Sequence, residues 1–180
     1  VPIEAVFEEK DVEHSIYEIP LLLSEQNLDD YIIKKLALEV QGEDLVPWKK
    51  LVETIKSPAS EIEVAMVGKY ITHQDAYKSV YEAIHHAGFA NDAKVNVRRV
   101  EAEQIEKGDP DRLLEGIHGI VVPGGFGYRG VEGKIKAIQY VRENRIPFLG
   151  LCLGMQCAVI EFARNVCDLQ DAHSSEFNEE

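Results

Sequence analysis

Beyond residue 61 the chain alternates between short continuous apolar runs and longer stretches in which apolar residues recur with a helical period. Strands are expected near residues 62–68, 94–99, 117–122 and 147–151. The periodic stretches predict helices near residues 75–87, 129–143 and 153–166, with less regular turns around 101–115. Strands that alternate with helices favour an α/β fold, in which an open, mostly parallel sheet has helices on both faces.

The first part of the chain follows a different pattern. We expect a short extended segment over residues 17–23. An amphipathic helix is expected from about Leu28 to Val40, and its apolar face must dock on a partner surface. Asn27 can cap the start of this helix and Gly42 can end it. One helix and one extended segment cannot form a core by themselves.

A connector is expected before the α/β pattern begins. A short helix near residues 48–55 precedes Ser57-Pro58-Ala59-Ser60, and such a cluster of proline and serine is typical of a boundary. We therefore divide the chain into residues 1–44, a linker over 45–61 and an α/β region over 62–180.

Composition narrows the classes of protein. Of the 180 residues, 45% are apolar, which is typical of a globular protein, and no apolar run is long enough to span a membrane. The net charge of −13 argues against a nucleic-acid surface. The three cysteines, Cys152, Cys157 and Cys167, have no disulfide-framework spacing, so a reducing, cytoplasmic setting is expected. The chain opens without methionine or a visible signal peptide, which suggests an internal segment of a longer protein.

One cysteine lies between two glycines where a strand should turn into a helix, in Gly150-Leu151-Cys152-Leu153-Gly154. This pattern is the thiol counterpart of the G-x-S-x-G nucleophile elbow, in which a tight, strained turn exposes the nucleophile. We expect the glycines to allow that turn and to keep side chains away from the sulfur. N–H groups at the helix N-terminus would favour the thiolate. The simpler alternative is a buried cysteine in a core helix.

A second motif is the glycine-rich loop Pro123-Gly124-Gly125-Phe126-Gly127-Tyr128-Arg129-Gly130, which follows a buried strand. One predicted helix separates this loop from Cys152, so the flanking strands should form a βαβ unit and run parallel. Their C-terminal ends then meet at the edge of the sheet where ligands bind. The N–H groups of Gly125 and Leu153 are therefore candidate oxyanion donors beside the sulfur.

These motifs resemble those of the class I glutamine amidotransferases. The residues of PGGFGYRG followed by FLGLCLGMQ are similar to those of the CTP synthase family. AMVGKY with DAYKSV resembles the opening of that family's amidotransferase domain, and KDV with SIYEIP resembles the end of its synthetase domain. The resemblance implies a flavodoxin-like sheet. It also implies that residues 1–44 end a synthetase domain and that 62–180 are the first half of an amidotransferase domain.

The resemblance assigns roles to the residues that match the family's motifs. It implies that Cys152 is the nucleophile that forms a glutamyl thioester, with oxyanion N–H groups from Gly125 and Leu153. The residues implied to bind glutamine are Gly125, Leu153, Gly154, Met155, Gln156 and Glu176. The residues implied to contact ATP are Lys10, Asp11 and Val12. No metal ligand is implied within the chain.

The same resemblance implies an activity for the parent protein. This ligase would hydrolyse glutamine and use the ammonia, with ATP, to convert UTP to CTP. Mg²⁺ would accompany the nucleotides, although its ligands are not expected in this chain. GTP would act as an activator, and the protein would form a homo-oligomer, a tetramer in the family.

A base for the thiol is not evident in the sequence. In this class the histidine and glutamate partners come from a motif downstream of the cysteine, and no histidine here begins such a motif. The candidates are His14, His73, His85, His86, His118 and His173. His173 alone follows Cys152, and it reads as a loop residue. We therefore expect this chain by itself to lack glutaminase activity.

Two alternatives stay open. The first is another cysteine-elbow amidotransferase or hydrolase on the same fold. The second is a non-catalytic module whose exposed helix, Leu28 to Val40, serves assembly. A glutamine-derived electrophile separates them, because an assembly module would leave Cys152 unlabelled.

Overall fold

The computed structural model describes residues 1–40, 44–69, 71, 74–125 and 127–176. Contacts divide the chain into two compact units. The first comprises Val1–Ser60 with Phe89–Lys94, and the second comprises Glu61–Gly88 with Val95–Glu180. The assignment of residues 1–44 to a synthetase domain and of 45–61 to a linker stays a prediction.

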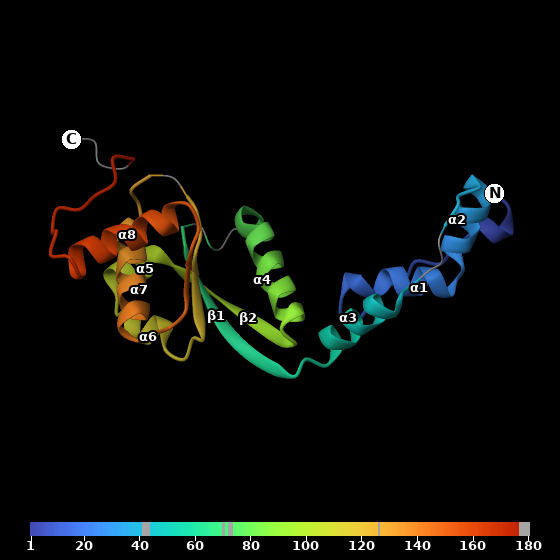
Figure 1. Cartoon of the computed structure of the whole chain (residues 1–180), viewed down its shortest axis with the longest axis horizontal. Coiled ribbons are helices and arrows are strands. Elements are labelled where there is room, and N and C mark those ends of the chain that lie inside the picture. The colour runs from blue at the N-terminus through green and yellow to red at the C-terminus, as the bar shows by residue number, and fades with distance from the viewer. Residues whose placement is uncertain (41–43, 70, 72–73, 126, 177–180) are drawn as a thin grey trace. The chain divides into compact units, whose positions relative to one another are not determined.

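A four-stranded sheet with the order β2-β1-β3-β4 organises the second unit (Figure 1). Its strands are β1 (Ser60–Gly68), β2 (Ala93–Glu101), β3 (Gly119–Val122) and β4 (Phe148–Gly150). β1 pairs in parallel with β3, and β3 pairs in parallel with β4. The predicted parallel α/β sheet is confirmed, and each strand lies within a few residues of its expected position.

Helices cover both faces of this sheet. They are α4 (Lys78–Ala90), which follows the short 3₁₀ helix η3 (Gln74–Tyr77), and α5 (Ala102–Lys107), α6 (Pro110–Leu114), α7 (Val131–Glu143) and α8 (Leu153–Asn165). Figure 1 shows α4 on one side of the sheet and α5, α7 and α8 on the other. The irregular turns expected around 101–115 are wrong, because this stretch forms α5 and α6. Asp109 caps α6 by accepting from the Asp111 N–H, and Pro110 lies in its first turn.

Alternation along β1 divides the apolar side chains between two cores. Ala65 and Val67 point into the larger core, which α5 to α8 cover, whereas Met66 points into a smaller core with Tyr81 of α4. The predicted apolar face of α7 is buried in the larger core, through Val131, Ile135, Ile138 and Val141. Burial on both faces explains the continuous apolar runs of β3 and of the second half of β1.

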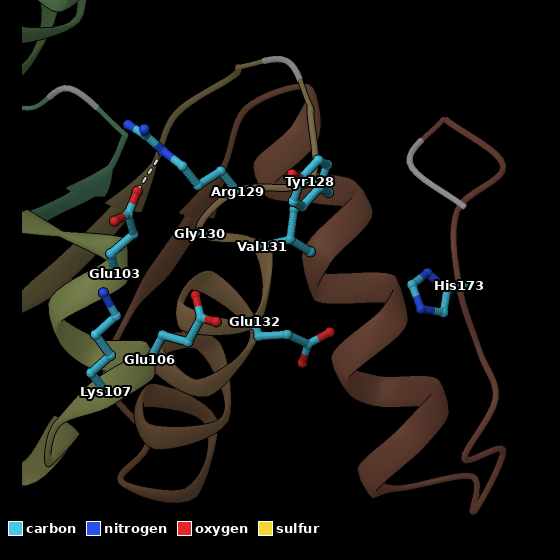
Figure 2. A pocket seen from close by; sticks show the side chains of 9 residues that line it. All are labelled: Glu103, Glu106, Lys107, Tyr128, Arg129, Gly130, Val131, Glu132 and His173. Atoms are coloured by element: carbon cyan, nitrogen blue, oxygen red, sulfur yellow. Dashed lines mark ion pairs between the residues drawn. The ribbon is translucent and has the colours of Figure 1, made fainter. Parts of the chain in front are cut away.

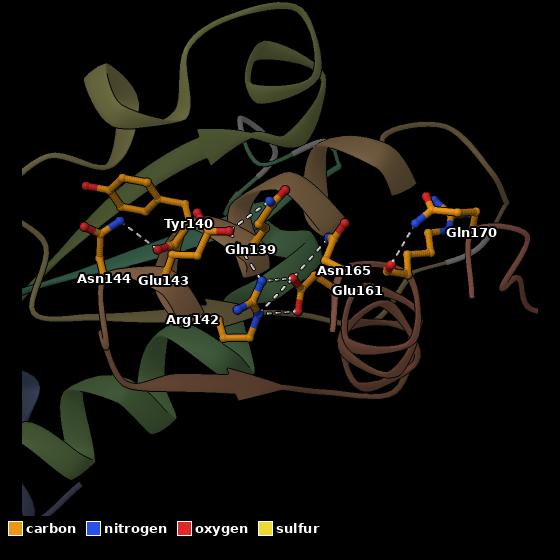
Figure 3. Close-up of polar contacts among 9 residues, drawn as sticks. Gln139, Tyr140, Arg142, Glu143, Asn144, Glu161, Asn165 and Gln170 are labelled. Atoms are coloured by element: carbon orange, nitrogen blue, oxygen red, sulfur yellow. Dashed lines mark hydrogen bonds and ion pairs between the residues drawn. The ribbon is translucent and has the colours of Figure 1, made fainter. Parts of the chain in front are cut away.

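One close backbone contact and one polar cluster join α7 to its neighbours. A Cβ atom placed on Gly133 would lie 1.8 Å from the carbonyl oxygen of Ala102, so α5 and α7 approach too closely for any side chain there. Glu161 of α8 is 1% exposed and accepts hydrogen bonds from both Nε and Nη2 of Arg142 of α7 (Figure 3). Asn165 donates to the same carboxylate. This bidentate pairing compensates the burial of the charge.

The first unit is built from helices. They are η1 (Ile3–Ala5), η2 (Ile16–Glu18), α1 (Ile19–Glu25), α2 (Leu28–Leu36) and α3 (Val46–Lys56). The extended segment expected over 17–23 is wrong, since η2 and α1 make it helical. Ser15 and Glu18 form a capping box, and Pro20 lies in the first turn of α1, where its missing N–H costs no hydrogen bond.

Helix α2 is shorter than its apolar spacing predicts. It ends at Leu36, because Ala37 adopts a left-handed conformation with φ 50°. Asn27 is also left-handed, and its side chain makes no capping hydrogen bond, so the expected cap is wrong. Gly42, the expected end of the helix, lies outside the described residues. No helix within the described ranges combines the length and the apolar character needed to cross a membrane.

Candidate active site

Cys152 lies at the predicted strand-to-helix elbow, between the end of β4 and the first residue of α8. Its backbone has φ 51° and ψ −108°, an unusual conformation for a residue with a side chain. Cys152 is exposed and is a free thiol. Strain of this kind is typical of functional positions that the surrounding structure holds in place.

The elbow glycines are required by close backbone packing. A Cβ on Gly150 would lie 2.7 Å from the backbone of Gly154, and one on Gly154 would lie 2.0 Å from the carbonyl oxygen of Val122. That these two glycines also keep side chains away from the sulfur stays a prediction. A Cβ on Gly124, in the neighbouring loop, would lie 4.0 Å from the Cys152 Sγ.

The glycine-rich loop adjoins the elbow, as the predicted βαβ unit requires. Val122, at the end of β3, is in register with Gly150, and its carbonyl oxygen accepts a hydrogen bond of 2.9 Å from the N–H of Leu151. A Cβ on Gly125 would lie 3.8 Å from the Leu153 side chain. The structure thus brings Gly125 and Leu153 together, on the strand ends that carry Cys152.

Lys134 is a site residue that the sequence prediction missed. It lies on α7 and is 1% exposed, and its Nζ would be 3.6 Å from a Cβ on Gly125. Burial lowers the pKa of Lys134 below the ordinary lysine value, and Lys69 lowers it further, whereas Cys157 and Cys152 raise it. The available signal was positional: Lys134 is three residues after Val131 and four before Ile138, on the apolar face of its helix.

Two residues predicted to bind glutamine are joined by hydrogen bonds. Gln156 Nε2 donates to Glu176 Oε2 over 2.7 Å, and Ser174 Oγ donates to Gln156 Oε1 over 3.0 Å. These contacts tie the segment after α8 to the first turn of that helix. Met155 is not part of this hydrogen-bonded group. Its exposed side chain lines an apolar groove that also contains Phe148. The close packing of Gly154 on Val122 makes it a packing residue.

The described histidines do not partner Cys152. His173 lines a cavity of about 410 Å³ with Glu103, Tyr128 and Arg129 (Figure 2), and Cys152 is not part of that lining. His118 accepts from the Glu63 N–H at the start of β3, the end of the strand away from the elbow. His73 lies outside the described residues. Within the described part of the chain, no hydrogen bond joins a histidine to Cys152.

The residues predicted to contact ATP belong to the first unit. Lys10 and Asp11 are exposed, Val12 is half-buried, and the Lys10 ammonium pairs with Glu8 at 2.8 Å. The described residues contain no group of three or more His, Cys, Asp or Glu side chains that could hold a metal ion.

Comparisons with known proteins match both motifs and the fold. The family model described as glutamine amidotransferase class-I matches residues 72–179. CTP synthase from Caldanaerobacter subterraneus is 57% identical over 178 residues, which cover 99% of this chain and 33% of that protein. CTP synthase from Desulfitobacterium hafniense is 54% identical over 175 residues, which cover 97% of this chain and 33% of that protein. The chain thus spans about a third of the length of these relatives.

A solved structure gives the same picture of the fold. The glutaminase domain of Trypanosoma brucei CTPS, with bound acivicin, superposes with a TM-score of 0.61 at 44% sequence identity. The match covers 66% of this chain and 47% of that one. A four-stranded parallel sheet with flanking helices is therefore shared with a solved glutaminase domain.

Proposed function

Because this chain belongs to the class I glutamine amidotransferases, we propose that Cys152 is the nucleophile that releases ammonia from glutamine. The observation that carries the proposal is the position of this exposed thiol. It lies on a strained elbow, adjacent to the glycine loop, at the C-terminal ends of two parallel strands. That edge is where open α/β sheets bind their ligands.

The proposed reaction begins with attack of the Cys152 sulfur on the carbon of the glutamine side-chain amide. A C–S bond forms, and the carbonyl oxygen takes up negative charge that the N–H groups of Gly125 and Leu153 would stabilise. The C–N bond then breaks, and the nitrogen leaves as ammonia after it gains a proton. Water hydrolyses the resulting thioester to glutamate and restores the thiol.

Recognition of the substrate is proposed for the pair formed by Gln156 and Glu176. The Glu176 carboxylate would accept hydrogen bonds from the α-ammonium group of glutamine, a charge-assisted contact. Its present hydrogen bond to Gln156 holds it near the first turn of α8. Met155 would contribute backbone more than side chain, since its side chain lines the apolar groove.

The base that accepts the thiol proton is not among the contacts of Cys152 in the described residues. We therefore propose that the 180-residue chain turns over glutamine very slowly, because removal of a member of such a triad abolishes most of the rate. The strained elbow and the oxyanion donors would remain competent to react with an electrophile.

For the protein that contains this chain, we propose the activity named for its relatives, CTP synthesis. Ammonia from glutamine would aminate UTP after activation by ATP, which Lys10, Asp11 and Val12 would contact. GTP activation, Mg²⁺ with the nucleotides, a homotetramer and a cytoplasmic location belong to the same proposal.

Acivicin provides the test, since it is bound in the related glutaminase domain. The purified chain is incubated with acivicin, and adducts are located by peptide mass spectrometry. We expect labelling of Cys152 but not of Cys167, which is equally an exposed free thiol, and we expect protection by L-glutamine. Equal labelling of the two cysteines without protection would contradict the proposal.

Two neighbouring glycines supply matched variants for the same assay. Gly124→Val should abolish labelling, because its side chain would lie against the Cys152 sulfur. Gly125→Ala should still be labelled, because a Cβ there meets only ordinary contacts of 3.6 Å and 3.8 Å. A parallel assay of glutamate release should detect no turnover by the chain, and turnover that is lost in Cys152→Ala would show that it contains a base.

A further inference from the structure

Lys134 is an ionisable residue in the core that the proposed reaction does not use. Its side chain lies on the apolar face of α7, among Val131, Ile135 and Ile138. No ion pair and no side-chain hydrogen bond joins its Nζ to a described residue. Placing most of a lysine side chain among apolar residues is costly, and methionine would fill the same space without that cost. A charged residue at a core position of a helix is an exception to the usual apolar pattern, and such exceptions occur mostly at functional positions.

The Nζ of Lys134 lies under the glycine loop. It would be 3.6 Å from a Cβ on Gly125, whose N–H is a proposed oxyanion donor. The titratable groups that face it are Cys152 and Cys157 of the elbow and α8, and Lys69 at the end of β1. No carboxylate of the described residues contributes to this set.

Of the groups that face Lys134, one can become its counter-charge. Lys69 has the same sign. Burial raises the pKa of Cys157 to about 11, so that thiol is neutral near pH 7. Cys152 is an exposed free thiol at the elbow. The arrangement therefore directs the Lys134 side chain toward the glycine loop and the elbow.

We propose that Lys134 is a positioning residue for the thiol chemistry, whose ammonium stabilises the negative charge that passes from the Cys152 sulfur to the substrate oxygen beside Gly125. This inference rests on the proposed role of Cys152 as the nucleophile. Lys134 keeps its proton throughout, so no bond to it forms or breaks. Because the charge is buried, it is screened little by salt and needs no reorganisation during the reaction.

The test is the pH dependence of alkylation by iodoacetamide, measured separately for Cys152 and Cys167 by peptide mass spectrometry. In Lys134→Met we expect the Cys152 rate at pH 7 to fall about tenfold, which corresponds to loss of one nearby opposite charge. The pH of half-maximal rate should rise, and the Cys167 rate should not change. Lys136→Met removes the same charge from an exposed position of α7 and should leave both rates unchanged.

Thermal unfolding separates this role from a structural one. Removal of the buried charge should raise the melting temperature of Lys134→Met by about 3 °C while the reactivity of Cys152 falls. If Lys134→Met does not fold, Lys134→Gln serves as the second neutral variant, with the same expected loss of rate. A Cys152 rate and pH profile unchanged in either folded variant would overturn the inference.

The proposed function can fail independently. If acivicin does not select Cys152 in the unmodified chain, the nucleophile proposal is wrong, and the role of Lys134 falls with it. If acivicin selects Cys152 but the neutral variants retain the full alkylation rate, only the role of Lys134 is wrong. Loss of rate at Cys167 together with Cys152 would also overturn the inference, because it would indicate a general change in structure.

Discussion

The two units of the chain are stabilised in different ways. In the second unit, both faces of the sheet bury continuous apolar cores, which include residues such as Leu114 and Met66 at 0% exposure. In the first unit, the buried apolar side chains among the described residues are those of Val52 and Ala93. Helices α1 and α2 bury none. A rigid core is what can hold a strained elbow such as that of Cys152.

Polar contacts take the place of a core in the first unit. Trp48 Nε1 donates to the carbonyl oxygen of Tyr17 over 2.7 Å, and the Lys56 ammonium pairs with Glu18 at 2.6 Å. Such contacts each contribute little net stability, because the unfolded chain makes equivalent bonds with water. Amphipathic spacing alone therefore does not produce a core. The α/β unit succeeds because parallel strands supply two apolar faces at once.

The largest expected effect is a loss of stability of the second unit, caused by a steric clash with backbone. Gly133→Ala places a Cβ 1.8 Å from the Ala102 carbonyl oxygen, so α5 and α7 must separate. We expect a loss of about 3 kcal/mol or more in the free energy of unfolding, measured by urea denaturation with far-UV circular dichroism. Gly119→Ala is the control, because its Cβ would lie an ordinary 3.6 Å from the nearest atom. Equal losses in the two variants would contradict this account.

The same truncation in the two units should give unequal losses. Leu114→Ala, in the larger core of the second unit, should cost about 3 kcal/mol through lost burial and a cavity. Leu22→Ala, at 37% exposure on α1, should cost less than about 1 kcal/mol. Urea denaturation of each variant provides the comparison. Similar losses would show that the first unit has a core of comparable quality.

The difference should also be visible in the unmodified chain. Trp48 is the single tryptophan and lies in the first unit, so its fluorescence reports on that unit alone. We expect its urea midpoint to lie at least about 1 M below the midpoint of the far-UV circular dichroism, which the second unit dominates. Coincident midpoints would mean that the two units unfold as one.

The features predicted from sequence are those that local periodicity and glycine motifs determine. The strands, the α7 face and the elbow at Cys152 follow from the spacing of apolar residues and from paired glycines. The glycine loop was placed correctly, although Gly125 has ordinary backbone conformation and Gly127 and Gly130 have φ 77°. The close packing of Gly150 and Gly154 on neighbouring backbone was missed, because backbone packing between elements is invisible in the sequence.

Short helices and a buried charge were missed for different reasons. Helices α5 and α6 are too short to show a period, and only α6 has a local signal, in Asp109 and Pro110. The helical turn η2, which leads into α1, had a readable signal in Ser15 and Glu18, which form its capping box. Lys134 was missed because lysine is usually exposed, although its spacing from Val131 and Ile138 places it on the apolar face of α7.

The smallest expected effect is a change in stability at low pH, and it should be confined to the first unit. The Lys56 ammonium and backbone N–H groups lower the pKa of Glu18 from 4.5 to about 2. A carboxylate whose pKa is lowered on folding stabilises the folded state above pH 4.5, and this contribution is lost as the pH falls toward 2. The Trp48 fluorescence should therefore change less between pH 4.5 and pH 2 in Glu18→Gln than in the unmodified chain, because the variant has no such contribution to lose. Glu9→Gln, which removes the same charge from an exposed position, should titrate like the unmodified chain. If all three chains showed the same acid transition at Trp48, the Glu18–Lys56 pair would not contribute to the first unit.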